Sequence, residues 1–576
     1  MPNYEYTSIP TPPDPTYHCI RLLKLKPGAK EEQISISVFF DVLEDCEPYE
    51  ALSYCWGDPA SLIQIKLDDK DFMVTANLYT ALLHLRREDT ERTLWIDAIC
   101  IDQKDWAEKG QQIALMRRIY ATAERGVVWL GELGILGELG LGLVARILKL
   151  ARSQSLPKMQ YNGNEWVGEG LPSSLEAPWK GLKLILASPW FSRKWIIQEL
   201  ATPKEITILI GSQTLPWDDL AIAMYLIGDG DFASTRTLAD RSRCVLLAGL
   251  RMHCQGKRKI SLLSLLRAFS GNGATEPKDH IFGLKTLIED EDNNDLFNYE
   301  SSFAELSIQT ARTICSEHKQ LDSLKFVFGK SLDPSDDEFP SWVADWRPSQ
   351  GERPQLLKGS YSGWEHGLSH GVFAATKGSE FTPQDLELPR YMTVRGMIID
   401  EIFRIRDSFD EDDLFNLLRW TEMTDLTTLD SDTVPKETFC RVICGGRSVD
   451  DVDEPFSEKD LQRTQSFLEM LRERKEKRMP GDANSVYRNT EYYPVGRHIT
   501  STCFERRLIQ TLSGHFGLVP QRANFFDQVC LLMGSDVPYI LRQAGDDWCV
   551  VGHCYVDGLM KGEGFVEEEC KNMVLV

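Results

Sequence analysis

Two side chains near residue 200 have types and a spacing that could serve binding or catalysis. Trp195 and Glu199 are four residues apart in a segment with a helical pattern, so we expect them to share one helix face, with Ser192 as the N-cap. A carboxylate beside a reacting sugar stabilises the oxocarbenium-like cation that forms when a glycosidic bond breaks, and an indole can stack on a ring. The structural alternative is that Trp195 belongs to the core and Glu199 caps or pairs with a neighbour.

Two aspartates flank the end of a predicted strand. Residues 93–101 are almost entirely apolar, as expected of a strand covered on both faces, yet Asp97 lies within this run and Asp102 follows it. Parallel sheets bind ligands at the carboxyl ends of their strands, so both are candidate substrate-binding residues. A carboxylate in an apolar strand needs a partner, so Asp97 fits equally well as a buried side chain bonded to backbone amides. A two-carboxylate metal site is the weakest alternative, because His84 is the only histidine nearby in the sequence.

A strong turn follows the preceding predicted strand. The apolar residues 49–56 end at Trp56, and Gly57, Asp58 and a proline come next. Trp56, Gly57 and Asp58 could therefore line a nucleotide pocket, although an ordinary turn covered by a tryptophan explains them equally well. The phosphate-loop pattern and the nucleophile elbow of hydrolases are both absent from the sequence.

Alternating strands and helices would position these residues. Apolar runs predict strands at 19–25, 34–42, 49–56, 93–101, 126–131 and 205–210, and helical spacing predicts helices at 78–85 and 113–123. This order is typical of an α/β fold in which helices wrap a parallel sheet. We predict a flavodoxin-like domain at residues 18–215, interrupted by a glycine-rich insertion at 133–186.

The rest of the chain is expected to differ in character from this domain. Residues 1–17 are polar and rich in proline, which predicts a disordered N-terminus. Residues 216–490 are predicted to be mainly helical or irregular, with Trp342 and Trp346 in the core. From residue 500 to 576, short strands separated by glycine turns predict a small C-terminal β module.

Composition excludes several classes of partner. The net charge of −23 argues against binding to nucleic acid or to an anionic membrane. No run of about 18 uncharged apolar residues occurs, so no membrane span is expected, and the polar N-terminus does not suit a secretory signal. The 14 cysteines are scattered, and many lie in apolar runs where a free cysteine acts as a small hydrophobic side chain, which predicts a reducing, cytoplasmic compartment. Their spacing does not suit a zinc site, and we predict neither a bound metal nor a cofactor.

Four long motifs resemble the heterokaryon incompatibility (HET) domain of fungi. They are YEALSYCWGD from Tyr49, LWIDAICIDQ from Leu94, QQIALMRRIY from Gln111 with VVWLG after it, and FSRKWIIQE from Phe191. Weaker similarity covers 275–284, 340–346 and 514–563. The resemblance implies a non-self-recognition factor that triggers programmed cell death, with self-association through the HET domain and an unknown protein partner or trigger.

The same domain is more loosely similar to Toll/interleukin-receptor (TIR) domains, through residues 53–57, 109–113 and 192–200. The spacing departs from theirs, because an extra residue separates Ser192 from Trp195, Ile196 replaces the usual cysteine, and the 133–186 insertion is added. Several TIR domains hydrolyse NAD and depend on a helix glutamate. The resemblance therefore implies a TIR-like fold, NAD as a substrate rather than a cofactor, and Glu199 as the catalytic residue.

Two non-enzymatic functions stay open at this point. A HET domain could signal only by binding partners, or the chain could be a regulatory HET-domain protein without cell-death activity. We also expect residues 216–576 to restrain or recruit the effector domain, because no nucleophile, metal or phosphate motif occurs there.

Overall fold

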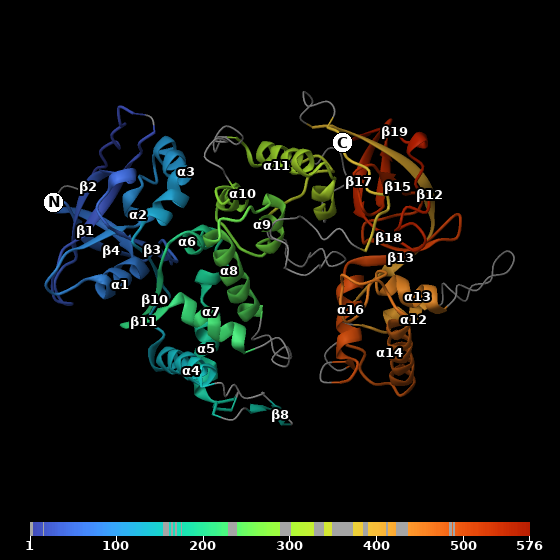
Figure 1. Ribbon diagram of the computed structural model, residues 1–576, viewed down its shortest axis with the longest axis horizontal. Coiled ribbons are helices and arrows are strands. Elements are labelled where there is room, and N and C mark those ends of the chain that lie inside the picture. The colour runs from blue at the N-terminus through green and yellow to red at the C-terminus, as the bar shows by residue number, and fades with distance from the viewer. Residues whose placement is uncertain are drawn as a thin grey trace. The chain divides into compact units, whose positions relative to one another are not determined.

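The computed structural model contains two compact units (Figure 1). Unit 1 comprises Met1–Lys259 and Ala268–Asn294, and unit 2 comprises Ile260–Arg267 and Asp295–Val576. The boundary predicted at residue 215 falls inside unit 1. The residues that the structure describes are 4–14, 16–153, 160–162, 165–167, 170–173, 175–227, 239–288, 301–327, 339–347, 372–383, 390–410, 413–421, 436–482, 486–487 and 490–576.

In the described part of unit 1, nine strands form one mixed sheet in the order β11-β10-β7-β3-β6-β1-β2-β4-β5. The central strands β6, β3, β7 and β10 are mutually parallel, as predicted, whereas β1 and the pairs at both edges are antiparallel. The predicted parallel sheet is therefore confirmed for the central strands, whereas the antiparallel pairs at β1 and at the edges were not predicted. The strands are β1 (Cys19–Leu25), β2 (Ser35–Val42), β3 (Glu50–Tyr54), β4 (Leu62–Leu67), β5 (Lys70–Thr75), β6 (Arg92–Trp95), β7 (Arg125–Trp129), β10 (Ile206–Ile210) and β11 (Gln213–Pro216).

The hairpin β4–β5 explains part of this difference. Asp68 and Asp69, between the two strands, both have positive φ, at 48° and 62°. Two consecutive left-handed residues form the primed turn that matches the twist of an antiparallel pair. An Asp-Asp pair is a weaker hairpin signal than Asn-Gly, so the sequence pattern did not indicate these two strands.

The two helices predicted between the strands are confirmed. Helix α1 (Ala76–Leu85) buries the predicted stripe of Leu78, Ala81, Leu82 and Leu85, and the Thr75 side chain accepts a hydrogen bond at its N-terminus. Helix α3 (Trp106–Thr122) includes most of the helix predicted at 113–123, buries Ile113, Met116 and Tyr120, and has Asp105 as its N-cap. Near the N-terminus, in the segment predicted to be disordered, the Tyr4 backbone bonds to Asp71 and the Tyr6 hydroxyl donates to the Ile99 carbonyl.

The 133–186 segment contains a pair of helices that pack through glycine. Helix α4 (Gly134–Arg152) lies against α5 (Ala177–Leu186), with a small hairpin of β8 (Gln160–Asn162) and β9 (Glu165–Val167) between them in the sequence. A Cβ atom built on Gly140 would lie 2.5 Å from the carbonyl carbon of Gly181. Gly140 of α4 and Gly181 of α5 therefore allow the two helix backbones to approach closely, so Gly140 has a packing role.

This contact predicts opposite effects for two substitutions in one helix. Gly140→Ala should lower the free energy of unfolding by about 1–3 kcal/mol, because the added methyl group overlaps the α5 backbone. Gly142→Ala is the matched control: nothing lies within 4 Å of its Cβ position, so it should stabilise by about 0.5–1 kcal/mol through helix propensity. Thermal melting of both full-length variants measures this, and a shift of the same sign for both would show that α4 and α5 do not pack as described.

Five further elements of unit 1 contain or follow the fourth motif, which begins at Phe191. They are η2 (Pro189–Ser192), α6 (Ile196–Ala201), α7 (Trp217–Leu226), α8 (Ala239–Gln255) and α10 (Asp279–Lys285). Helix α6 contacts α3, α8 and α10, and all six of its residues are buried. The short α6 therefore lies in the interior of unit 1.

In the described part of unit 2, eight strands form a second sheet, which is barrel-like. Strand β15 pairs with both β16 and β12, so the sequence β15-β16-β17-β19-β12 closes on itself. This agrees with the predicted C-terminal β module. The strands are β12 (Met392–Ser408), β13 (Arg506–Thr511), β14 (Phe516–Pro520), β15 (Gln528–Leu532), β16 (Tyr539–Ala544), β17 (Asp547–His553), β18 (Tyr555–Val556) and β19 (Lys571–Leu575).

The 17-residue strand β12 corrects the prediction for residues 216–490. Helices do dominate this region, but β12 lies within it and pairs with β13, β15 and β19. Register shifts at Ile398/Asp400 and Ile402/Arg404 interrupt the strict alternation of its side chains, so the pattern resembles that of an amphipathic helix. Trp342 and Trp346 are buried, as predicted.

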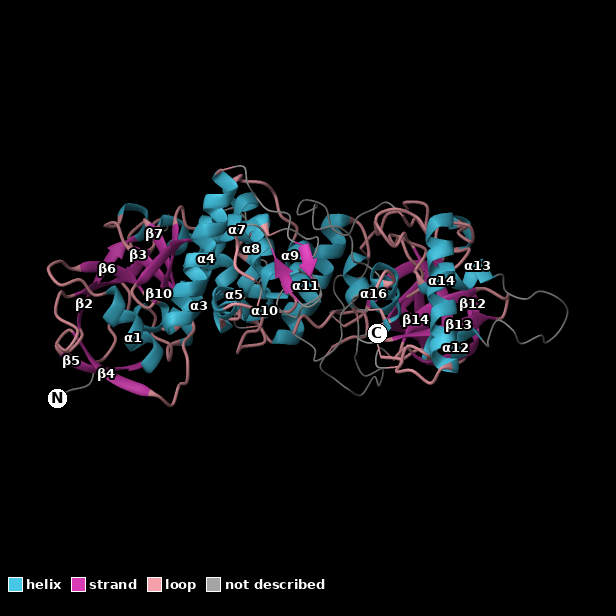
Figure 2. Cartoon of the chain, turned by 90° about the horizontal axis from the view of Figure 1, so that it is seen from below, coloured by secondary structure: helices cyan, strands magenta, loops and turns pink. Residues whose placement is uncertain are grey.

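Six helices belong to the described part of unit 2, and two of them contact its barrel-like sheet. The six helices are α9 (Leu262–Ala268), α11 (Phe303–His318), α12 (Asn416–Thr421), α13 (Lys436–Ile443), α14 (Glu458–Glu476) and α16 (Tyr493–Cys503). Helix α13 contacts β14 and α16 contacts β13. Figure 2 distinguishes the helices and strands by colour. Among the described helices of either unit, none combines the length and the apolar character needed to cross a membrane.

Candidate functional site

Glu199 lies buried beneath the carboxyl end of the parallel strands. Its carboxylate accepts a short hydrogen bond from the hydroxyl of Ser53, in β3, and the Trp190 indole donates to the same Ser53 oxygen at 2.7 Å. Only 3% of Glu199 and 1% of Ser53 are exposed. The first and the last of the four motif blocks therefore meet through one side-chain hydrogen bond across 146 residues of sequence.

The environment of Glu199 shifts its acidity toward neutral pH. Burial raises the pKa of its carboxyl group to about 7, and the nearby Asp97 adds to this, whereas Arg193 and the Ser53 hydroxyl lower the pKa. Burial therefore outweighs the favourable partners. A carboxyl group with a pKa near the working pH can both hold and release a proton, which suits acid–base chemistry.

Arg193 connects the buried glutamate to the surface. Its Nη1 atom lies 4.0 Å from Glu199 Oε2 and donates to the carbonyl oxygen of Tyr54 at the end of β3. A quarter of the Arg193 side chain is exposed, and its charge also lowers the pKa of Asp97. Sequence reasoning missed Arg193, although a cation in the same motif block as a candidate catalytic glutamate was a usable signal.

Asp97 joins this cluster, but the element that holds it differs from the prediction. Strand β6 ends at Trp95, and Asp97 is the first residue of the four-residue helix α2 (Asp97–Cys100), so its predicted place inside a strand is wrong. The amide of Cys100 donates a hydrogen bond to the Ile96 carbonyl at 2.7 Å, so the chain forms a single helical turn directly after β6. Burial raises the pKa of Asp97, against the opposing effects of Arg193 and of the Trp56 indole.

Trp56 lies over Asp97 at the surface of unit 1. Its Nε1 atom donates to Asp97 Oδ2 at 2.8 Å, and 41% of the residue is exposed. Gly57 has φ of +80°, where a Cβ atom would also lie 3.2 Å from Asn77, so this turn requires glycine. Asp58 accepts a hydrogen bond from the amide of Ala60 and is part of the same turn.

Two predicted residues have other partners. Asp102 Oδ1 accepts a hydrogen bond from the Lys104 amide at 3.0 Å, just before α3. The indole of Trp195 donates to Asp279 Oδ2 at 2.8 Å, so Trp195 and Glu199 bond to different elements. The structure brings Trp56, Asp97 and Glu199 together around Arg193.

The predicted N-cap is also wrong. Helix α6 begins after Trp195 and has no side-chain cap, while the Ser192 hydroxyl donates to the Pro189 carbonyl in the preceding turn η2. The side chain that does cap η2 is Ser188, whose hydroxyl accepts from the Trp190 amide. The irregular turn between η2 and α6 leaves Arg193 extended toward β3.

A later segment of the chain fixes this turn. Asn272 donates from its side-chain amide to the carbonyls of Phe191 and Arg193, at 3.1 and 2.9 Å. The buried Lys194 ammonium donates to the Phe269 carbonyl at 2.7 Å, and burial lowers its pKa to about 7. The candidate site therefore depends on residues well beyond position 215.

The raised pKa of Glu199 predicts a pH-dependent loss of stability. Between pH 4.5, the ordinary pKa of the group, and about pH 7, the folded state binds its proton more tightly than the unfolded state. The free energy of unfolding should therefore fall with rising pH in this window, by about 3 kcal/mol from this group. Glu199→Gln removes the titration, so the stability difference between wild type and variant, from urea unfolding at each pH, should change by that amount. A constant difference from pH 4.5 to 8 would contradict the burial of an ionisable Glu199.

Comparison with known proteins agrees with the motifs. Residues 49–199 match the family "Heterokaryon incompatibility protein (HET)", and residues 447–576 match the family "Het-6 beta-barrel domain". The chain is 26% identical over 398 residues to "Heterokaryon incompatibility protein 6, OR allele" of Neurospora crassa, and the alignment covers 58% of each protein. No solved structure matches.

The two matched families correspond to the two units described above. The HET match spans β3 to α6 and contains Trp56, Asp97, Arg193 and Glu199, and the barrel match contains strands β13 to β19. The resemblance stated from the sequence motifs is thereby confirmed. Residues 49–199 are therefore similar to the heterokaryon incompatibility (HET) family, and residues 447–576 are similar to the Het-6 β-barrel family.

Proposed function

We propose that this chain acts in heterokaryon incompatibility as a cytoplasmic non-self-recognition factor, and that its HET domain triggers cell death by hydrolysing NAD. The name of the Neurospora crassa relative supports the first part. The second part depends on one observation: Glu199, at the motif position of a catalytic glutamate, is buried against Ser53 with its pKa raised to about 7.

The order of the parallel strands supports a TIR- or flavodoxin-like arrangement. Taken in chain order, β3, β6, β7 and β10 are strands one to four, and in the sheet they lie in the order two, one, three, four. Such doubly wound sheets bind ligands outside the carboxyl ends of the strands, where the order reverses. Ser53 and Tyr54 end β3, and Asp97 follows β6, so the cluster lies at this end of the sheet.

The cluster can perform hydrolysis of the nicotinamide–ribose bond. As that bond breaks, its electron pair leaves with nicotinamide and positive charge develops on the ribose carbon. The Glu199 carboxylate would stabilise that charge and then accept a proton from the attacking water, so that the products are nicotinamide, ADP-ribose and a proton. The exposed ring of Trp56 offers a surface for stacking on a substrate ring.

Access to Glu199 requires a change in the structure, since only 3% of it is exposed. The partly exposed Arg193 side chain lies 4.0 Å from Glu199, and the exposed Trp56 bonds to the neighbouring Asp97, so we take these two side chains as the cover of the site. We propose that self-association of the HET domain, or a protein trigger, opens this cover. The closed state equally suits a HET domain that signals only by binding partners, which is the alternative function.

NAD consumption by the purified full-length chain at increasing protein concentrations tests the proposal. If self-association opens the site, the rate per molecule rises with protein concentration, and nicotinamide and ADP-ribose form in equal amounts. If no NAD is consumed at any concentration, the enzymatic proposal fails. The binding-only account or a regulatory role without cell death then explains the protein better.

A further inference from the structure

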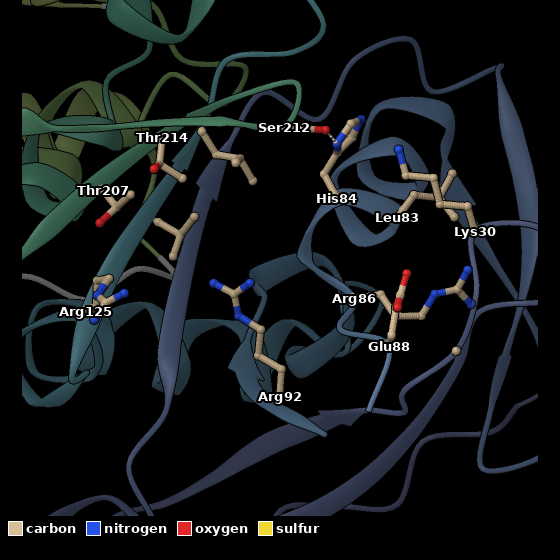
Figure 3. Close-up of a pocket in the computed structure, with 13 residues that line it drawn as sticks. Lys30, Leu83, His84, Arg86, Glu88, Arg92, Arg125, Thr207, Ser212 and Thr214 are labelled. Atoms are coloured by element: carbon tan, nitrogen blue, oxygen red, sulfur yellow. Dashed lines mark hydrogen bonds between the residues drawn. The ribbon is translucent and has the colours of Figure 1, made fainter. Parts of the chain in front are cut away.

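Unit 1 has a cavity of about 290 Å³ that the candidate site does not use (Figure 3). It lies on the face of the sheet that α1 partly covers, beside the strands β7 and β10. Its apolar lining consists of Leu83 from α1, Val127 from β7 and Leu209 from β10. The volume is near the lower end of the range for small-molecule pockets.

Basic side chains border this cavity. Four basic residues line it: Lys30, Arg86, Arg92 and Arg125. Among the described lining residues, Glu88 is the single acidic residue. Figure 3 shows Arg125, Arg92 and Arg86 along one side of the cavity and the hydroxyl side chains of Thr207, Thr214 and Ser212 along the other. A local excess of positive charge is unexpected in a chain with a net charge of −23.

Two of the arginines share one buried carboxylate. Glu50, in β3, is 6% exposed; it accepts a short hydrogen bond from Arg92 Nε and lies 3.7 Å from Arg125 Nη1. The single negative charge of Glu50 is thus shared by two positively charged guanidinium groups. Arg125 Nε is buried without a hydrogen bond, and the carboxylate of Glu205 near it, at 3.8 Å, is largely exposed and screened by solvent.

The other two cations complete the border. Arg86 is held in place because its guanidinium donates to the backbone carbonyls of Ala29 and Glu32. Lys30 is exposed beside it, on the loop that follows β1. Guanidinium groups fixed in advance recognise phosphate by paired hydrogen bonds, and the order of the surrounding side chains reduces the entropy lost on binding.

The two arginines that share Glu50 and the Glu199 cluster lie at opposite ends of the same strands. Arg92 is the first residue of β6 and Arg125 the first residue of β7, whereas Tyr54 ends β3 and Asp97 follows the end of β6. Because these strands are parallel, their amino ends share one edge of the sheet and their carboxyl ends share the other. The cavity also reaches Leu209 near the carboxyl end of β10, but it lies on the other face of the sheet from Glu199. Val127 lines the cavity, whereas Ser53, which bonds to Glu199, pairs with the next residue, Val128, and successive residues of a strand face opposite sides.

We propose that the cavity binds a nucleotide, with its phosphate groups held by the basic border and its base packed against Val127 and Leu209. The threonine and serine hydroxyls opposite the arginines are placed to bond to the sugar or to a phosphate oxygen. This assignment is independent of NAD hydrolysis and adds a second ligand site to the HET domain.

Calorimetric titration of the full-length protein with ADP, adenosine and inorganic pyrophosphate tests the assignment. ADP should bind saturably and more weakly as salt is raised, and both adenosine and pyrophosphate should bind at least about tenfold more weakly than ADP. Arg125→Gln and Lys30→Gln should each weaken ADP binding about tenfold, the loss expected for one charge-assisted hydrogen bond. Because Lys30 is exposed, Lys30→Gln should fold normally, and it tests the assignment even if Arg125→Gln is destabilised.

Matched controls separate the cavity from the candidate site. Arg152→Gln and Lys70→Gln remove exposed charges elsewhere in unit 1 and should leave ADP binding unchanged, as should Glu199→Gln. The assignment is overturned if wild type does not bind ADP saturably, or if both cavity variants bind it as wild type does. Loss of ADP binding in Glu199→Gln with retention in Arg125→Gln would place the nucleotide at the other site and also overturn it.

Discussion

Full-length protein carrying Glu199→Gln should lose NAD hydrolysis by at least about a hundredfold while its fold stays intact. Gln keeps the shape of the side chain and can still accept the hydrogen bond from Ser53, but it cannot carry the negative charge that a developing oxocarbenium ion requires. Loss of one such electrostatic contact costs on the order of 3 kcal/mol in the barrier. The rate of nicotinamide release at fixed protein concentration, measured beside the melting temperature, gives both results on one sample.

Glu205→Gln is the matched control for this variant. Glu205 lies six residues further along in the same unit, and its side chain is 73% exposed, so the same change should alter neither rate nor melting. A structural role for Glu199 predicts a different result, in which NAD turnover falls only in proportion to the loss of folded protein. Unchanged turnover in a well-folded Glu199→Gln protein would contradict the catalytic role directly.

Lys325→Met should be among the most destabilising single changes in unit 2. The Lys325 ammonium is fully buried, donates to Asp322 at 2.7 Å and lies 2.5 Å from Asp536 Oδ1, and Asp322 is itself 1% exposed. Removal of the cation leaves two carboxylates facing each other in a site with little solvent, which lowers the free energy of unfolding by about 3–5 kcal/mol.

The surface pair of Lys459 and Asp450 provides the control for Lys325. Its nitrogen–oxygen distance is also 2.7 Å, but 71% of the lysine side chain is exposed, so Lys459→Met should change stability by less than about 1 kcal/mol. Urea unfolding of the three proteins compares the two pairs. Equal effects at both positions would show that the Lys325 cluster is not desolvated.

Local patterns predicted the elements of the HET domain that have regular periodicity. The four apolar residues spaced along α1 are the ones that this helix buries, and β1 has its predicted bounds. Such elements follow from local spacing because one buried face decides their type. The recognition of the HET family likewise depended on contiguous motifs.

The candidate site depended on contacts that local patterns do not contain. Ser53 and Glu199 are 146 residues apart, and nothing near either residue in the sequence indicates the other. From the sequence, Asp97 was predicted to lie inside a strand at residues 93–101. In the structure it starts a short helix and accepts a hydrogen bond from Trp56. The segment at Phe269 and Asn272 supports the site from outside the four motifs.

Expression of the full-length chain in a fungal host, with wild type and Glu199→Gln at equal abundance, tests the central claim most directly. Cell viability and cellular NAD are measured over the same period after induction. The account predicts that wild-type protein depletes NAD and kills the cells, and that equally abundant, folded Glu199→Gln protein does neither. Cells killed by Glu199→Gln at the wild-type rate would contradict it.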